Sequence, residues 1–113
     1  MEKIVLFNGT RETFDIVKNI AGSMKVHTFC QIGKPGTIKE LTDGAVKEFA
    51  EPDDANCLLM FCDISEKHMD SMLARLRTGT AKIDFKAILT PTNSGWNYKR
   101  LIFELQREQA GLK

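Results

Sequence analysis

Polar side chains that could bind a small anion follow the predicted strands of this 113-residue chain. They are hydroxyls, amides and one carboxylate, and each group stands between a strand and the helix that comes next. Backbone N–H groups at a helix N-terminus, joined by such side chains, form anion-binding sites. The candidate ligand-binding residues are Asn8, Thr10, Asp63, Ser65, Thr90, Thr92 and Asn93.

Catalytic and metal chemistry have little support in the residue types. His68 is the only candidate for general acid–base work, with Asp63 within reach on the preceding turn. His27 and Cys30 are three apart on a predicted strand, so their side chains point to opposite faces. We therefore assign no catalytic residue, no metal ligand and no cofactor, and we do not expect an enzyme.

The three cysteines, Cys30, Cys57 and Cys62, lie in apolar runs without a Cys-x-x-Cys pair. An odd number of this kind is typical of small buried hydrophobic residues in a reducing compartment, so we expect a cytoplasmic protein. The formal net charge is only +1, which argues against a nucleic-acid or membrane-surface protein. No apolar run approaches the roughly 20 residues that span a bilayer.

Hydrophobic periodicity predicts four strands, each followed by a helix. Strands are expected over about residues 3–7, 25–31, 57–62 and 86–90, and three helices over about 11–21, 65–79 and 95–109. Thr37 and Glu40 have the spacing of a capping box before the remaining helix. Gly44 interrupts that helix, so it is either one short turn or a weak helix of three turns.

The strict alternation favours a single α/β domain over residues 1–113, without internal repeats. We expect a four-stranded, mainly parallel sheet with the order 2-1-3-4, flanked by helices. All strands then run in one direction, and the candidate ligand residues gather along one rim. The alternative is a ferredoxin-like α+β sandwich with an added C-terminal helix, in which those residues scatter.

The last predicted helix carries two kinds of surface. Its core stripe, at i, i+3, i+4 and i+7, consists of Tyr98, Leu101, Ile102 and Leu105. Two aromatic residues lie on nearly the opposite side, and an arginine follows each by four residues, where it can stack on the ring. These candidate interface residues are Trp96, Arg100, Phe103 and Arg107.

The string from Lys86 to Trp96 reads Lys-Ala-Ile-Leu-Thr-Pro-Thr-Asn-Ser-Gly-Trp, and Glu104-Leu105 and Glu108 follow it. It resembles the signature of a family of small bacterial proteins that carry a domain of unknown function. The resemblance covers about residues 57–108. The family often has Gly-Phe before the serine that opens the preceding helix, where this chain has Asp63-Ile64. The resemblance implies no particular activity.

These observations favour a cytoplasmic, non-enzymatic binding or interaction module. Its partner would be a second copy or another protein, docked on the last helix. The alternative is a small-ligand or anion-binding regulatory protein that uses the strand-end residues. We expect neither nucleic acid nor membrane as a partner.

Overall fold

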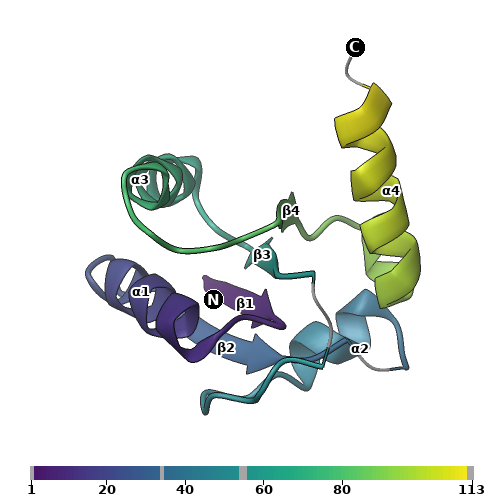
Figure 1. Cartoon of the computed structure of the whole chain (residues 1–113), viewed down its shortest axis with the longest axis horizontal. Helices are drawn as coiled ribbons and strands as arrows, with labels where there is room; N and C mark the ends of the chain where they lie inside the picture. The colour runs from purple at the N-terminus through teal and green to yellow at the C-terminus, as the bar shows by residue number, and fades with distance from the viewer. Residues whose placement is uncertain (1, 34, 54–55, 112–113) are drawn as a thin grey trace.

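The computed structural model describes residues 2–33, 35–53 and 56–111, and in them four strands alternate with four α-helices (Figure 1). The strands are β1 (Lys3–Phe7), β2 (His27–Gln31), β3 (Leu58–Cys62) and β4 (Phe85–Ile88). The helices are α1 (Arg11–Gly22), α2 (Ile38–Asp43), α3 (Glu66–Arg77) and α4 (Tyr98–Gly111), and the 3-10 turn η1 (Asn93–Gly95) comes before α4.

The helix N-termini form where the capping residues predict them. The side chains of Thr10, Thr37 and Ser65 each accept a hydrogen bond from the backbone N–H three residues later. Thr37 and Glu40 complete the predicted capping box.

The structure decides the length of one predicted helix, which the sequence left open, and corrects the start of another. Helix α2 has only six residues, because the backbone leaves the helical conformation at Gly44. Helix α4 begins at Tyr98 rather than near Gly95, since Trp96 has an extended backbone (ψ 156°) between η1 and the helix. Trp96 is therefore not a residue of the last helix.

The sheet has the predicted order β2-β1-β3-β4. Strand β1 is parallel to β2, and β3 is parallel to β4, but the central pair β1–β3 is antiparallel. The α/β fold with a mostly parallel sheet is thus confirmed, whereas the expectation that all four strands run in one direction is wrong. A helix follows every strand, unlike in the ferredoxin-like alternative.

The connection between β2 and β3 is 26 residues long (32–57), but its described part contains only a short helix. A six-residue helix is about 9 Å long, whereas a five-residue strand is about 17 Å long. Helix α2 is thus too short to return the chain along the whole sheet. The chain enters β3 at the edge where β1 ends, and the backbone N–H of Asp53 donates to Asn8 Oδ1 there (3.2 Å).

The two halves of the chain repeat one another around the central pair of strands. The starts of β1 and β3, and those of α1 and α3, are both 55 residues apart (58 − 3 and 66 − 11). Asn8 and Asp63, at the same separation, both have a left-handed backbone, with φ of 57° and 56°. Val5 pairs with Met60 at the centre of this approximate two-fold relation. The sequence-based expectation of no internal repeat is therefore wrong at the level of structure.

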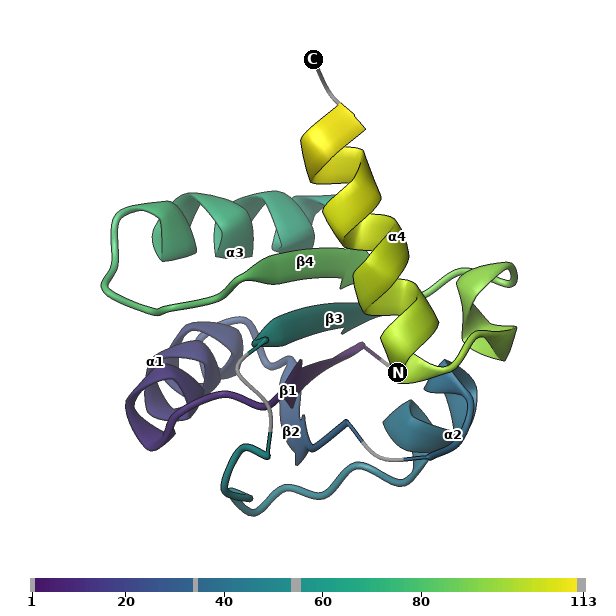
Figure 2. The ribbon, with the colours of Figure 1, turned by 45° about the vertical axis from the view of Figure 1, so that its right-hand side comes forward.

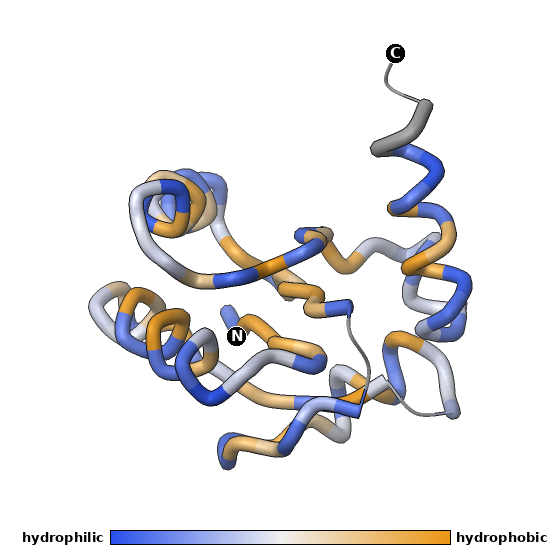
Figure 3. The backbone as a smooth tube through the Cα atoms, viewed as in Figure 1, coloured by the Kyte–Doolittle hydropathy of each residue, from blue (hydrophilic) through white to orange (hydrophobic). Residues whose placement is uncertain are grey.

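The sheet lies between two helical layers (Figures 1 and 2). Helices α1 and α3 cover one face, and α2 and α4 cover the other. Alternate residues of each strand belong to the two cores. In Figure 3 much of the orange colour, which marks hydrophobic residues, lies in the strands of the sheet. Each core contains residues of both halves, so the two repeats form one packed unit.

Candidate functional site

The antiparallel central pair separates the candidate ligand residues into two groups. Phe7 lies opposite Leu58, so Asn8 and Thr10 leave the sheet at the edge where β3 begins. The others leave at the opposite edge, after β3 and β4, and they are Asp63, Ser65, Thr90, Thr92 and Asn93. The predicted single rim is wrong, because strand direction reverses in the middle of the sheet.

Asn8 and Thr10 make contacts within the chain. The buried Asn8 side chain donates from Nδ2 to the Tyr98 hydroxyl (3.3 Å) and accepts from the N–H of Asp53 (3.2 Å). Thr10 Oγ1 caps α1 by accepting from the N–H of Thr13 (3.2 Å). These bonds join the turn after β1 to the start of α4 and to the segment before β3.

The N-terminus of α3 holds a carboxylate of the chain itself. Glu2 Oε2 accepts from the backbone N–H of Ser65 (2.6 Å), and its Oε1 lies 2.8 Å from Nδ1 of His68. The hydrogen bond from Ser65 N–H, and then that of His68, lower the pKa of the Glu2 carboxyl from its ordinary value of 4.5. His68 thus faces Glu2. The Glu2 carboxylate occupies the N-terminus of α3, where the sequence predicted that an external anion could bind.

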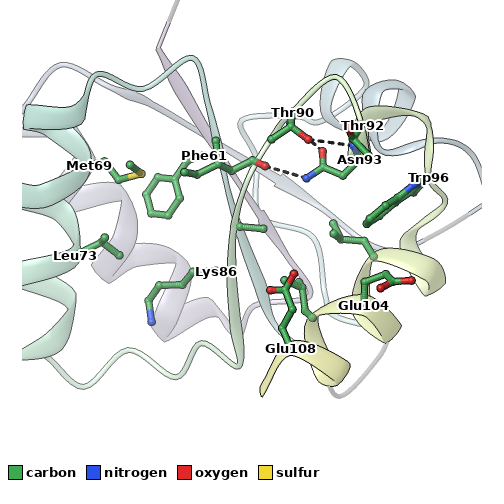
Figure 4. A pocket seen from close by; sticks show the side chains of 14 residues that line it. Phe61, Met69, Leu73, Lys86, Thr90, Thr92, Asn93, Trp96, Glu104 and Glu108 are labelled. Carbon is green, nitrogen blue, oxygen red and sulfur yellow. Dashed lines mark hydrogen bonds between the residues drawn. The ribbon is translucent and has the colours of Figure 1, made fainter. Parts of the chain in front are cut away.

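The Thr-Pro-Thr-Asn string forms a closed corner at the end of β4 (Figure 4). The buried carboxamide of Asn93 accepts from the N–H of Thr90 and donates to the carbonyl of Ile88, both at 2.9 Å. Thr90 Oγ1 accepts from the Asn93 N–H (3.1 Å). Thr92 is exposed. Thr90 and Asn93 therefore shape the corner through bonds to each other.

The cysteines are buried, as their apolar neighbours predict. Burial raises the pKa of Cys57 to about 12 and that of Cys62 to about 11, and it also raises the pKa of Cys30. A thiol with a pKa in this range is almost fully protonated at neutral pH, so these side chains are poor nucleophiles.

The candidate interface residues lie on two different surfaces. The guanidinium carbon of Arg100 lies 4.5 Å from the ring centre of Trp96, and that of Arg107 lies 5.9 Å from the ring centre of Phe103. Both predicted stacking contacts are thus present. Trp96, however, packs partly against the core below α4, whereas Phe103 is 57% exposed. The four residues therefore do not form the continuous stripe that was expected on the last helix, because Trp96 lies before the helix begins.

A groove at the outer edge of β4 was not identified from the sequence. It has a volume of about 520 Å³ and lies between α3 and α4 (Figure 4). Met69 and Leu73 line it from α3, and Trp96, Leu101 and Leu105 line it from the other side. Its charged lining residues are Lys86 on β4 and Glu104 and Glu108 on α4.

The floor of this groove is the free edge of a strand. The N–H groups of Phe85 and Leu89 donate to the carbonyls of Cys57, just before β3, and of Phe61 in β3. Lys86 and Ile88 alternate with these residues, so their N–H groups point away from β3. The Ile88 side chain is 50% exposed on the α3 side. The predicted strand order already made β4 an edge strand. The packing that leaves an apolar channel beside it depends on the tertiary structure.

Two further observations concern the part of the chain that the structure describes. There, no group of three or more histidine, cysteine or acidic side chains could hold a metal ion. Nor does any of the described helices have the length and apolar character needed to cross a membrane.

Residues 58–112 match the model of a family described as a domain of unknown function (DUF3783). The prediction of such a domain in the second half of the chain is confirmed. The matched segment runs from the start of β3 through α4, so it corresponds to the second of the two structural repeats. Neither a curated protein nor a solved structure matches the chain.

Proposed function

We propose that the chain is a protein-interaction module that binds an extended segment of a partner along the outer edge of β4. The observation that carries the proposal is this edge: the N–H groups of Lys86 and Ile88 point outward between apolar side chains of α3 and α4. In strand addition, main-chain hydrogen bonds provide affinity and alternate side chains provide specificity.

The apolar walls of the groove add to the main-chain bonds. Full burial of an isoleucine side chain is worth about 1.5–3 kcal/mol. Because Ile88 is 50% exposed, covering it would contribute roughly 1 kcal/mol. Met69 and Leu73 are partly buried and lie on the same side of β4. An apolar side chain of the partner would therefore find contacts there.

A second copy of this chain fits the β4 edge less well than a foreign segment. One antiparallel register between two β4 strands places Lys86 opposite its own copy, and like charges directly opposite are destabilising. A lysine on a short edge strand is a common device against self-association.

The experiment compares two substitutions at one position. Peptides selected from a random displayed library on the full chain are measured by calorimetry against Lys86→Pro and Lys86→Ala. Proline removes the outward N–H without removing a bond to β3, and edge strands tolerate it there. We expect Lys86→Pro to weaken binding about tenfold or more, and Lys86→Ala to change it by less than about threefold.

Circular dichroism of both variants checks that they are folded. Selection of no binding peptide overturns the proposal. Wild-type affinity in a folded Lys86→Pro variant also overturns it, because the peptide would then bind elsewhere.

A second candidate is the homodimer predicted through the last helix. The observation that favours it is the exposed ring of Phe103, on which Arg107 stacks. Aromatic and arginine side chains dominate the binding energy of many interfaces. Light scattering should then give twice the chain mass of 12.7 kDa for the wild type and the mass of one chain for Phe103→Glu. Lys67→Glu at an exposed position of α3 is the control, and a monomeric wild type contradicts the dimer.

We do not extend the proposal to a small anionic ligand. Glu2 already accepts the bond from Ser65 N–H at the start of α3, and the carboxamide of Asn93 is bonded at both ends. Those contacts use the groups that such a ligand would need.

A further inference from the structure

The first repeat shows how the edge strand of this fold is covered. At the outer edge of β2, Val46 forms an antiparallel bridge with Cys30, and the chain then bends so that the Ala50 N–H donates to Cys30 Sγ (3.3 Å). The Cys30 N–H donates to the Val46 carbonyl (2.6 Å), and the Val46 N–H donates to the Cys30 carbonyl (3.1 Å). The edge of β2 thus has an antiparallel partner within the chain.

The strand registers identify the matching position in the second repeat. Leu6 pairs with Cys30, and Phe61, which is 55 residues later (61 − 6), pairs with Ile88. Ile88 is therefore the structural counterpart of Cys30. In the described part of the chain, no segment pairs with the outer edge of β4. The groove described above lies where the covering segment would run.

The covering segment of the first repeat is anchored by an aromatic side chain. Phe49 packs against Phe14 of α1, with ring centres 5.9 Å apart. The residue 55 positions after Phe14 is Met69, which lines the groove beside β4. Thioether groups make favourable contacts with aromatic rings. The second repeat therefore has an apolar contact surface at the position where Phe49 packs in the first repeat.

From this relation we infer that the partner segment runs antiparallel to β4, pairs with Ile88 through the outward N–H of Ile88, and places an aromatic side chain on Met69 and Leu73. The aromatic residue stands three positions after the one opposite Ile88, as Phe49 follows Val46. This inference rests on the proposed function, and it adds the direction, the register and the anchor residue of the bound segment.

A synthetic peptide with the sequence of residues 43–51, capped at both ends, is the probe. It is titrated into the isotopically labelled full chain and followed by NMR. We expect shifts of the Ile88 amide and of the Met69 methyl group that saturate with peptide. A peptide with Phe49→Ala should bind about tenfold more weakly. Ile88→Pro in the full chain, shown to be folded by its spectrum, should abolish the shift of the Met69 methyl group.

A nitroxide on either end of the peptide tests the direction. In an antiparallel complex, a label on the peptide N-terminus broadens Thr90. A label on its C-terminus broadens Met69, because the segment turns toward α3 as Ala50 turns toward Cys30. The reverse pattern, no saturable shift, or shifts confined to β2 would overturn the inference. None of these results would overturn the proposed function, which fails when no library peptide binds or when the selected peptides do not depend on the Lys86 N–H.

Discussion

The Asn93 carboxamide acts as the last hydrogen-bonding partner of β4. It bonds the Ile88 carbonyl and the Thr90 N–H, the groups that a neighbouring strand would otherwise engage. The Thr-Pro-Thr-Asn string therefore ends the strand edge and starts the turn toward α4. The hydrogen bonds of this string stabilise the corner. At the edge of β4, the backbone groups of Lys86 and the N–H of Ile88 are still available to a partner.

Replacing Asn93 by alanine should destabilise the fold. The change removes two hydrogen bonds from a buried side chain, each worth about 1 kcal/mol, so the free energy of unfolding should fall by about 2 kcal/mol. Thr92→Ala, at the exposed neighbouring position, should change it by less than about 0.5 kcal/mol. Urea unfolding measures both values. Equal stabilities of the two variants would show that the corner does not depend on the carboxamide.

Replacing Glu2 by glutamine should change the acid dependence of stability. The folded state lowers the pKa of this carboxyl, so its contribution to stability is complete above the ordinary value of 4.5 and is lost as the pH falls through the lowered value. The wild type should therefore exceed Glu2→Gln in free energy of unfolding by more at pH 6 than at pH 3. Glu48→Gln, at an exposed position, is the control. A difference independent of pH would contradict the role of Glu2.

At the scale of the elements, the turn after β2 and the first turn of α4 are packed without space between them. A Cβ atom on Gly33 would lie 2.6 Å from Cδ2 of the Tyr98 ring. That ring is buried against Phe7, with centres 5.3 Å apart, so it has little freedom to move. Close approach of the Gly33 backbone thus fixes where α4 starts.

Gly33→Ala should destabilise the protein by about 1–3 kcal/mol, the usual cost of overpacking a rigid site. The matched control is Gly22→Ala at the end of α1, where an added Cβ would have no neighbour within 4 Å. That control should leave stability unchanged or raise it by up to about 1 kcal/mol. Thermal and urea unfolding measure both. If Gly33→Ala is as stable as the wild type, α4 is not held against this turn.

At the scale of the whole molecule, the two repeats depend on each other. One core joins α1 with α3, and the other joins α2 with α4, on opposite faces of one sheet. Neither repeat contains a complete core. The central β1–β3 pair also crosses the boundary between the repeats.

The two repeats should therefore unfold in a single transition. The one tryptophan, Trp96, reports on the second repeat, and far-ultraviolet circular dichroism reports on the helices of both. We expect the two signals to give the same midpoint in urea. A fluorescence midpoint clearly separate from that of circular dichroism would show that the repeats are independent folding units.

The sequence determined the elements of this protein, because local patterns specify them. Thr10 and Ser65 cap their helices, and the apolar runs at 3–7 and 57–62 form the central strands of a sheet with the predicted order. These features depend on neighbours along the chain and on the apolar character of each strand.

Only the tertiary structure decided strand direction and the site that follows from it. The path of the whole connection between β2 and β3 decides on which side β3 begins, and local propensity left the length of its helix α2 open between one turn and three. The repeat could not be recognised in the sequence, because burial requires an apolar residue at a position but not a particular residue type. Phe14 and Met69, for example, occupy equivalent positions and share only hydrophobicity. The groove beside β4 depends on the distances of α3 and α4 from the outer edge of that strand. These distances are set by how the helices pack on the sheet, which local sequence patterns do not specify.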